Sequence, residues 1–131
     1  MNKKILLCDD ELHILRAAEF KFQRGGFDVR CAGDGEEAWE LIEQELPDIV
    51  VTDYQMPRLD GLGLAERMKN DPRTTHIPII VLTARGFELS TEELCERYGI
   101  RLMLAKPFSP RELSRRVEEI LEGRALDALS E

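Results

Sequence analysis

The chain has 131 residues, 43% of them hydrophobic, and a formal net charge of −8 at pH 7. This length accommodates one domain with a full core and excludes a second folding unit of ordinary size. The acidic balance argues against direct nucleic-acid binding, which needs a basic surface, and no apolar run approaches the roughly 18 residues that a membrane span requires.

The first residues and the cysteines indicate the compartment. Residues 1–4 lead directly into a short apolar run without a signal-peptide cleavage pattern, so we expect a cytoplasmic protein that does not associate with membranes. The three cysteines, Cys8, Cys31 and Cys95, are odd in number and lack metal-ligand spacing, and we expect them to be reduced.

Short apolar runs alternate with amphipathic segments of helix length along the whole chain. This alternation predicts five βα units, and hence an α/β fold whose parallel sheet is covered by helices on both faces. The segments that predict the five strands are 5–8, 27–32, 49–52, 79–82 and 102–105.

The first three helices are predicted by apolar spacing and by residues that begin or end helices. Gly25-Gly26 ends the first, which spans 11–24; a capping box at Asp34–Glu37 begins the second, and Pro47 follows its end. The third spans 61–70. The inward-facing residues that the spacing predicts are Leu12, Leu15, Ala18 and Phe22 in the first helix, Ala38, Leu41 and Ile42 in the second, and Leu64, Ala65 and Met68 in the third.

The last two helices differ in the strength of their patterns. Segment 89–98 is polar and predicts the weakest helix of the set. Residues 109–112 form a capping box with proline at the first helical position, and Gly123 is expected to end the helix that begins there. The domain is therefore expected to occupy residues 1–123, and residues 124–131 either continue as a frayed helix or begin a linker. The inward-facing residues predicted for this last helix are Leu113, Val117, Ile120 and Leu121.

Polar side chains follow four of the predicted strands. These residues are Asp10, Asp53, Thr83 and Lys106, each directly after an apolar run or one residue further on. Because the carboxyl ends of parallel strands meet at one edge of the sheet, where α/β proteins bind their ligands, we expect the four side chains to share one site.

The acidic residues of this edge predict a metal ion. Asp9, Asp10 and Asp53 would repel one another and raise their own pKa values unless a cation lay among them. Mg²⁺ prefers a few carboxylate oxygens, a carbonyl and several waters, so we expect Mg²⁺, or Mn²⁺ as the alternative, with Asp10 and Asp53 as direct ligands and Asp9 bound through water. A second interpretation, in which the paired aspartates only cap the first helix, leaves Asp53 and Lys106 unexplained.

A metal flanked by an ammonium and a hydroxyl suits an anion with several oxygens, and a phosphoryl group fits best. Lys106 would bind one oxygen, and the Thr83 hydroxyl with the Ala84 amide would bind another. Asp53 would then be the nucleophile that becomes an aspartyl phosphate. The alternatives are that Thr83 only bonds a backbone carbonyl and that Lys106 only pairs with an aspartate.

Five short motifs in order carry a resemblance to a known family: 7–11 (LCDDE), 52–57 (TDYQMP), 60–62 (DGL), 82–84 (LTA) and 105–108 (AKPF). Over roughly residues 3–122 the chain resembles the response-regulator receiver domains of two-component signalling, of the chemotaxis-regulator kind.

This resemblance implies the fold and the chemistry in more detail. The fold is a flavodoxin-like (βα)5 doubly wound sheet with strand order 2-1-3-4-5. Asp53 accepts a phosphoryl group in a Mg²⁺-dependent reaction from a sensor histidine kinase or a histidine phosphotransfer protein, and it loses the group slowly by self-catalysis. The resemblance also implies that the Gln55 carbonyl is a metal ligand and that the peptide between Lys106 and Pro107 is cis.

Some positions depart from the family pattern or modulate its chemistry. The switch aromatic that usually stands three residues before the lysine is Met103 here, and the acidic positions upstream of it are Arg101 and Leu102. Gln55 and Arg85 are placed to admit or block the water that removes the phosphoryl group. Arg85 either shields this group or lies in solvent, since we expect residues 85–90 to be mobile.

The function expected is therefore that of a phosphorylation-dependent signalling switch, which catalyses only its own phosphotransfer and dephosphorylation and is no enzyme in the usual sense. A phosphohydrolase is disfavoured because Gln55 stands where such enzymes carry an acid. The switch is either a stand-alone regulator or relay intermediate, or the receiver of a longer response regulator with an output domain. A phosphorylation-independent scaffold is the remaining alternative. The protein is expected to be a monomer or to dimerise on phosphorylation, and the sequence does not identify its downstream protein target.

Overall fold

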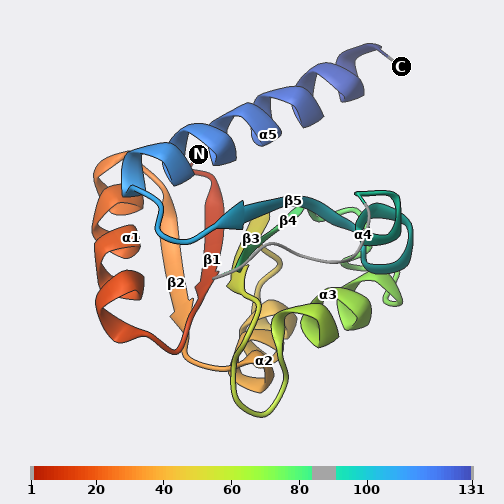
Figure 1. Ribbon diagram of the computed structural model, residues 1–131. Helices are drawn as coiled ribbons and strands as arrows, with labels where there is room; N and C mark the ends of the chain where they lie inside the picture. Colours follow the sequence, from red (N-terminus) through yellow and green to blue (C-terminus); the bar gives the residue numbers. More distant parts are fainter. Residues whose placement is uncertain (1, 84–90, 131) are drawn as a thin grey trace.

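The computed structural model, which describes residues 2–83 and 91–130, places a five-stranded sheet between two layers of helices (Figure 1). The strands pair in parallel in the order β2-β1-β3-β4-β5, as predicted. Their bounds are β1 Lys4–Cys8, β2 Asp28–Ala32, β3 Ile49–Asp53, β4 Ile79–Thr83 and β5 Ile100–Ala105.

The helices divide between the two faces of the sheet (Figure 1). Apolar residues of α1 and α5 share one core cluster with the sheet, and those of α2, α3 and α4 share the other. The helices are α1 Leu12–Arg24, α2 Gly35–Gln44, α3 Gly61–Lys69, α4 Thr91–Tyr98 and α5 Pro110–Ser130. Among the described residues, no helix combines the length and the apolar character that crossing a bilayer requires.

The continuous apolar runs follow from this double cover. In β1, Ile5 and Leu7 pack toward α1 and α5, whereas Leu6 and Cys8 pack toward α2 and α3. All residues of β3 and β4 are buried, because a parallel strand in the middle of the sheet has a helix layer on each side.

The N-cap side chain of each predicted capping box makes its expected hydrogen bond. The carboxylate of Asp34 accepts a hydrogen bond of 2.8 Å from the Glu37 N–H, and the Glu37 side chain accepts one of 2.7 Å from Gly33 N–H, one residue beyond the expected partner. At the start of α5, the Ser109 hydroxyl accepts a bond of 3.0 Å from Glu112 N–H. These local bonds satisfy amides that a helix leaves free at its first turn.

Two helix predictions are wrong. Leu12 is 60% exposed, although Leu15, Ala18 and Phe22 are buried as predicted. At 100° per residue, Leu12 points about 90° away from the centre of the other three.

Gly123 does not end the last helix, since α5 continues to Ser130. A glycine inside a helix costs only about 1 kcal/mol relative to alanine, and good helix formers follow it in the sequence. As far as Ser130, the continuation matches the helical alternative for the tail. Residue 131 and residues 85–90, the latter expected to be mobile, lie outside the described ranges.

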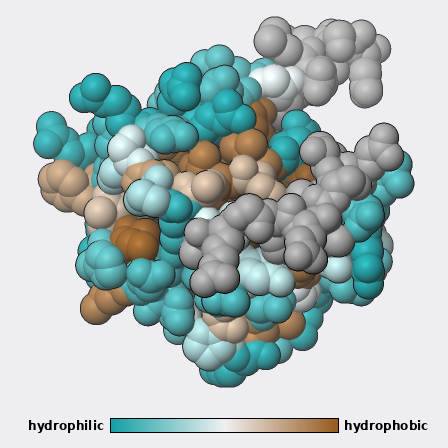
Figure 2. All heavy atoms as spheres, viewed as in Figure 1, coloured by the Kyte–Doolittle hydropathy of each residue, from teal (hydrophilic) through white to brown (hydrophobic). Residues whose placement is uncertain are grey.

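Apolar atoms gather between α5 and β5 on the face seen in Figure 2, while hydrophilic residues cover most of the rest of it. The half-buried apolar residues that pack there against the core include Leu102, Leu104, Ile120 and Leu121. On the opposite side of β5, Met103 packs half-buried against the core under α3 and α4.

Cys8 and Cys31 are free thiols, and the side chain of Cys95 lies outside the described part of the structure. Cys8 is fully buried, and burial raises its pKa far above the ordinary value. Burial, together with Glu19, raises the pKa of Cys31 to about 12. Neither group is therefore a thiolate near neutral pH.

Candidate functional site

The polar residues predicted to meet do lie at one edge of the sheet. Asp9 directly follows β1, Asp53 and Thr83 are the last residues of β3 and β4, and Lys106 follows β5. Thr83 is paired in register with Ala105, which brings Lys106 beside the end of β4. The parallel arrangement alone explains this convergence, because all four strands end on the same side.

Three carboxylates form an acidic cluster at this edge. Ligand oxygens of Asp9, Asp10 and Asp53 all lie within 4.8 Å of one another. Asp9 and Asp53 are buried and Asp10 is exposed. Burial, and next the charge of Asp9, raise the pKa of Asp53 above its ordinary value, although Lys106 opposes this effect. A carboxylate that is costly to ionise is one that gains from a nearby cation.

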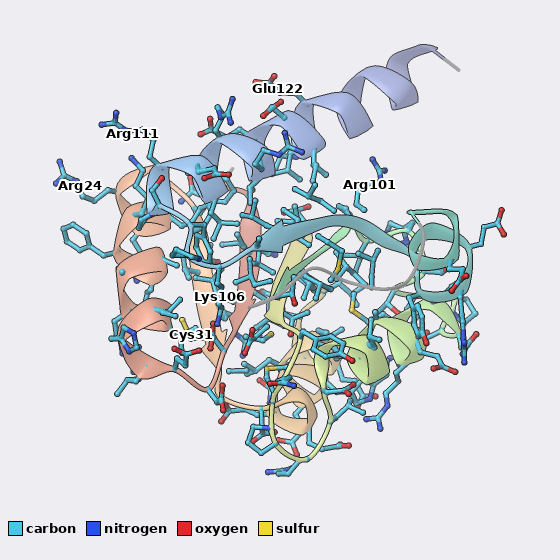
Figure 3. The ribbon with its side chains drawn as sticks, viewed as in Figure 1. Arg24, Cys31, Arg101, Lys106, Arg111 and Glu122 are labelled. Carbon is cyan, nitrogen blue, oxygen red and sulfur yellow. The ribbon has the colours of Figure 1, made fainter. Side chains whose placement is uncertain are left out.

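Lys106 provides the only ammonium that the described residues bring into this cluster (labelled in Figure 3). Its Nζ lies 3.1 Å from Asp9 Oδ2, 3.1 Å from Glu11 Oε1 and 3.2 Å from Asp53 Oδ1. Burial alone would lower the pKa of Lys106, but the hydrogen bonds to Asp9 and Glu11 outweigh burial and hold the pKa above its ordinary value. The side chain is therefore a fixed positive charge at neutral pH.

Backbone bonds hold these groups in place. Asp9 Oδ1 accepts a bond of 2.9 Å from Glu11 N–H, so Asp9 does bind an amide at the start of α1 while its other oxygen binds Lys106. The Lys106 N–H donates to the Thr83 carbonyl at 2.7 Å, and the peptide between Lys106 and Pro107 is cis, as expected. Because Glu11 is the N-cap residue that precedes α1, the bond from its N–H fixes the chain before the helix and does not satisfy an amide of the first helical turn.

The donor set fits a hard divalent cation. Four carboxylates, those of Asp9, Asp10, Glu11 and Asp53, face a single ammonium, so the edge keeps an excess of negative charge. Every donor is an oxygen, which favours Mg²⁺ or Mn²⁺ over softer metals. Gln55, whose carbonyl is the expected further ligand, lies in the exposed loop after β3.

The remaining predicted residues are placed as follows. Thr83 is 8% exposed at the end of β4, and Met103 is half-buried in β5. Arg101 projects to solvent from β5, away from Lys106 (Figure 3). Ala84 and Arg85 lie outside the described residues.

Glu11 was not among the residues predicted for this site. This residue is the N-cap of α1, where its side chain makes no capping bond and instead binds Lys106. Its place directly after the acidic pair was a signal that could have indicated membership of the site.

The match to a protein-family model agrees with this geometry. The model for the response regulator receiver domain covers residues 5–118. A sheet of order 2-1-3-4-5 with an acidic cluster and a lysine at its carboxyl edge is what the motifs implied. The chain belongs to the response regulator receiver domain family, the input modules of two-component signal transduction.

Relatives and solved structures support the assignment. The chain is 39% identical to the alkaline phosphatase synthesis transcriptional regulatory protein PhoP of Bacillus subtilis, over 99% of this chain and 53% of PhoP. It thus spans about half the length of the relatives it matches. Among solved structures, the receiver domain of the Francisella response regulator 1452 is 37% identical, with a TM-score of 0.79 over 95% of this chain and 99% of that one.

A further structure bears on the metal. The receiver domain of sensor histidine kinase PA1611 from Pseudomonas aeruginosa is 28% identical, with a TM-score of 0.79 over 93% of this chain and 99% of that one. Its structure has a magnesium ion coordinated in the active-site cleft.

Proposed function

We propose that this protein is a phosphorylation-dependent switch whose Asp53 accepts a phosphoryl group in a Mg²⁺-dependent reaction. The observation that carries the proposal is the contact of one half-buried ammonium, Lys106 Nζ, with both Asp53 and Asp9 beside the acidic cluster. These contacts support the proposal, because phosphoryl transfer needs a nucleophile, a positive charge and metal donors close together.

The donor of the phosphoryl group is the phosphohistidine of a sensor histidine kinase or a phosphotransfer protein. An oxygen of Asp53 forms a bond to phosphorus as the phosphorus–nitrogen bond breaks, and the electron pair of that bond leaves with the imidazole. The imidazole leaves neutral when its other nitrogen carries the proton. Lys106 donates a hydrogen bond to a phosphoryl oxygen throughout and gives up no proton.

The metal site follows from the same donors. Asp10 and Asp53 would bind Mg²⁺ directly, Asp9 through water, and Gln55 through its carbonyl. Mg²⁺ when bound would supply positive charge that offsets the charge of the phosphoryl oxygens. The magnesium in the cleft of the PA1611 receiver domain supports this choice of metal.

The signal would pass from the site to β5. The Thr83 hydroxyl, with the Ala84 amide, would bind the phosphoryl group, and Met103 would fill space behind Thr83. Met103 is flexible enough for this role but lacks the ring of the usual aromatic. Phosphorylation should therefore shift the Met103 methyl signal in NMR spectra, and an unchanged signal would contradict this route.

The protein would be no enzyme beyond its own phosphotransfer and dephosphorylation. Gln55 and Arg85 would set the lifetime of the phosphoryl group, and an unchanged half-life in Arg85→Ala would reject shielding by the guanidinium. PhoP is a transcriptional regulatory protein, and this supports control of transcription as the output of a longer response regulator.

The test is an intact-mass measurement after incubation with acetyl phosphate, with and without Mg²⁺. Wild type should gain one phosphoryl group only with Mg²⁺, and Asp53→Asn should gain none. Asp28→Asn is the matched control, because Asp28 is exposed at the amino end of β2, at the end of the sheet opposite to the site. No gain in wild type, or an equal gain in Asp53→Asn, would refute the proposal.

A further inference from the structure

Three carboxylates compete for the ammonium of Lys106. Its Nζ donates hydrogen bonds of 3.1 Å to Asp9 and 3.1 Å to Glu11, and it lies 3.2 Å from Asp53 in an ion pair. A protonated lysine has three donors, and two of them are held by Asp9 and Glu11. A phosphoryl oxygen that binds Lys106 therefore competes with these carboxylates for the ammonium.

The three acceptors differ in what their release would cost. The Asp9 side chain is 3% exposed, and its second oxygen is held by the Glu11 N–H. The Asp53 side chain is 9% exposed and is the group that reacts. The Glu11 side chain is 48% exposed, and its second oxygen lies 3.9 Å from the exposed His13 ring. Water can take the place of Lys106 at Glu11, whereas at Asp9 it would have to enter a buried site.

We propose that Glu11 is a releasable counter-ion of Lys106 that restrains the phosphorylation of Asp53. In the unphosphorylated protein Glu11 holds one donor of the ammonium, and it competes with an incoming phosphoryl group for Lys106. Glu11 is thus a positioning residue that acts through Lys106 and does not touch the reacting atoms. This inference rests on the proposed function, since it assigns a role in the same reaction.

A second effect of Glu11 has to be separated from this one. Its negative charge also repels an anionic phosphodonor, whether or not it binds Lys106. Repulsion is independent of Lys106, whereas competition for a donor exists only while the lysine is present. The two effects therefore differ in a double-mutant cycle.

The first experiment measures the phosphorylation rate with acetyl phosphate at saturating Mg²⁺ for Glu11→Gln and for Glu19→Gln. Both residues belong to the α1 region and both changes remove one negative charge, but Glu19 pairs with Arg16 at 2.8 Å. We expect Glu11→Gln to react roughly three to five times faster than wild type, as the loss of one partly exposed ion pair allows. Glu19→Gln should stay within about twofold.

The cycle is completed in a Lys106→Met background. There the acceleration caused by Glu11→Gln should disappear, and an acceleration that persists would assign it to repulsion and overturn the proposal. Equal rates for Glu11→Gln and wild type would overturn it as well. If wild type gains no phosphoryl group, the proposed function is refuted. If wild type gains the group but Glu11→Gln behaves as wild type, only the role of Glu11 is refuted.

A measurement without metal or phosphodonor gives an independent test. The ¹⁵N NMR signal of the Lys106 ammonium in the free protein should shift in Glu11→Gln, because one of its three acceptors weakens. It should not shift in Glu19→Gln. An unchanged Lys106 signal in Glu11→Gln would show that the contact is not held in solution and would refute the inference.

Discussion

Replacing Gly61 by alanine should destabilise the protein and displace Asp53. Gly61 is the first residue of α3, and its N–H donates to the Tyr54 carbonyl at 2.9 Å. A Cβ at this position would lie 2.4 Å from the carbonyl oxygen of Asp53 and 3.1 Å from the Cα of Tyr54. Both are backbone atoms, so no side-chain rotation can relieve the contact.

The expected cost follows from this overlap. Real Cβ atoms keep at least 3.0 Å, so α3 and the end of β3 must separate by about 0.6 Å, the difference from the 2.4 Å of the unrelaxed contact. Overpacking typically costs 1–3 kcal/mol, and a contact that only backbone movement relieves belongs at the upper end, about 3 kcal/mol. With a urea m-value of about 1.5 kcal/mol/M, the unfolding midpoint should fall by about 2 M.

Urea unfolding monitored by circular dichroism, without Mg²⁺, measures this change. Gly123→Ala is the matched control, because its Cβ would meet no atom within 4 Å and it lies inside α5. We expect that control to stabilise the protein by about 0.5–1 kcal/mol through helix propensity. A midpoint for Gly61→Ala within about 0.3 M of wild type would refute the steric reasoning.

Three further predictions concern the site and a helix cap. Burial and the charge of Asp9 raise the pKa of Asp53 above 3.8, so without Mg²⁺ the wild type should lose stability relative to Asp53→Asn as pH rises from 3.5 to 7. If the difference between their urea midpoints is the same at pH 3.5 and at pH 7, the raised pKa is contradicted. Mg²⁺ at ten times its Kd should raise the unfolding free energy by about 1.4 kcal/mol, which is measured as a higher Tm. Asp10→Asn should abolish most of this gain. If Mg²⁺ stabilises Asp10→Asn as much as wild type, Asp10 is not a metal ligand. Asp34→Ala should lower the unfolding free energy by about 1 kcal/mol, because it removes the 2.8 Å hydrogen bond from Glu37 N–H. Asp34→Asn should retain most of the stability, because asparagine can accept the same bond. Equal urea midpoints for the two variants would show that loss of the cap bond does not cause the destabilisation.

The strands and caps could be predicted from the sequence because their causes are local. A continuous apolar run such as that of β3 reports burial on both sides, and the capping boxes at Asp34 and Ser109 lie within four residues of the amides they bind. The helix errors had a different origin. Leu12 is as hydrophobic as a core residue, but its position around the axis of α1 points away from the core. Gly123 would end a helix only if the chain turned there, and α5 continues through it.

The sequence by itself determined which residues stand at the carboxyl ends of the strands, and parallel pairing brings those ends together whatever the side chains do. Only the tertiary structure decided how the groups divide their bonds. Glu11 and Lys106 are 95 positions apart, and β1 and β5 are separated in the sheet by β3 and β4. The number of carboxylates that Lys106 contacts depends on how far its side chain and that of Glu11 extend across the edge of the sheet between β5 and β1. No local pattern in the sequence encodes this distance, because it results from the packing of the whole sheet.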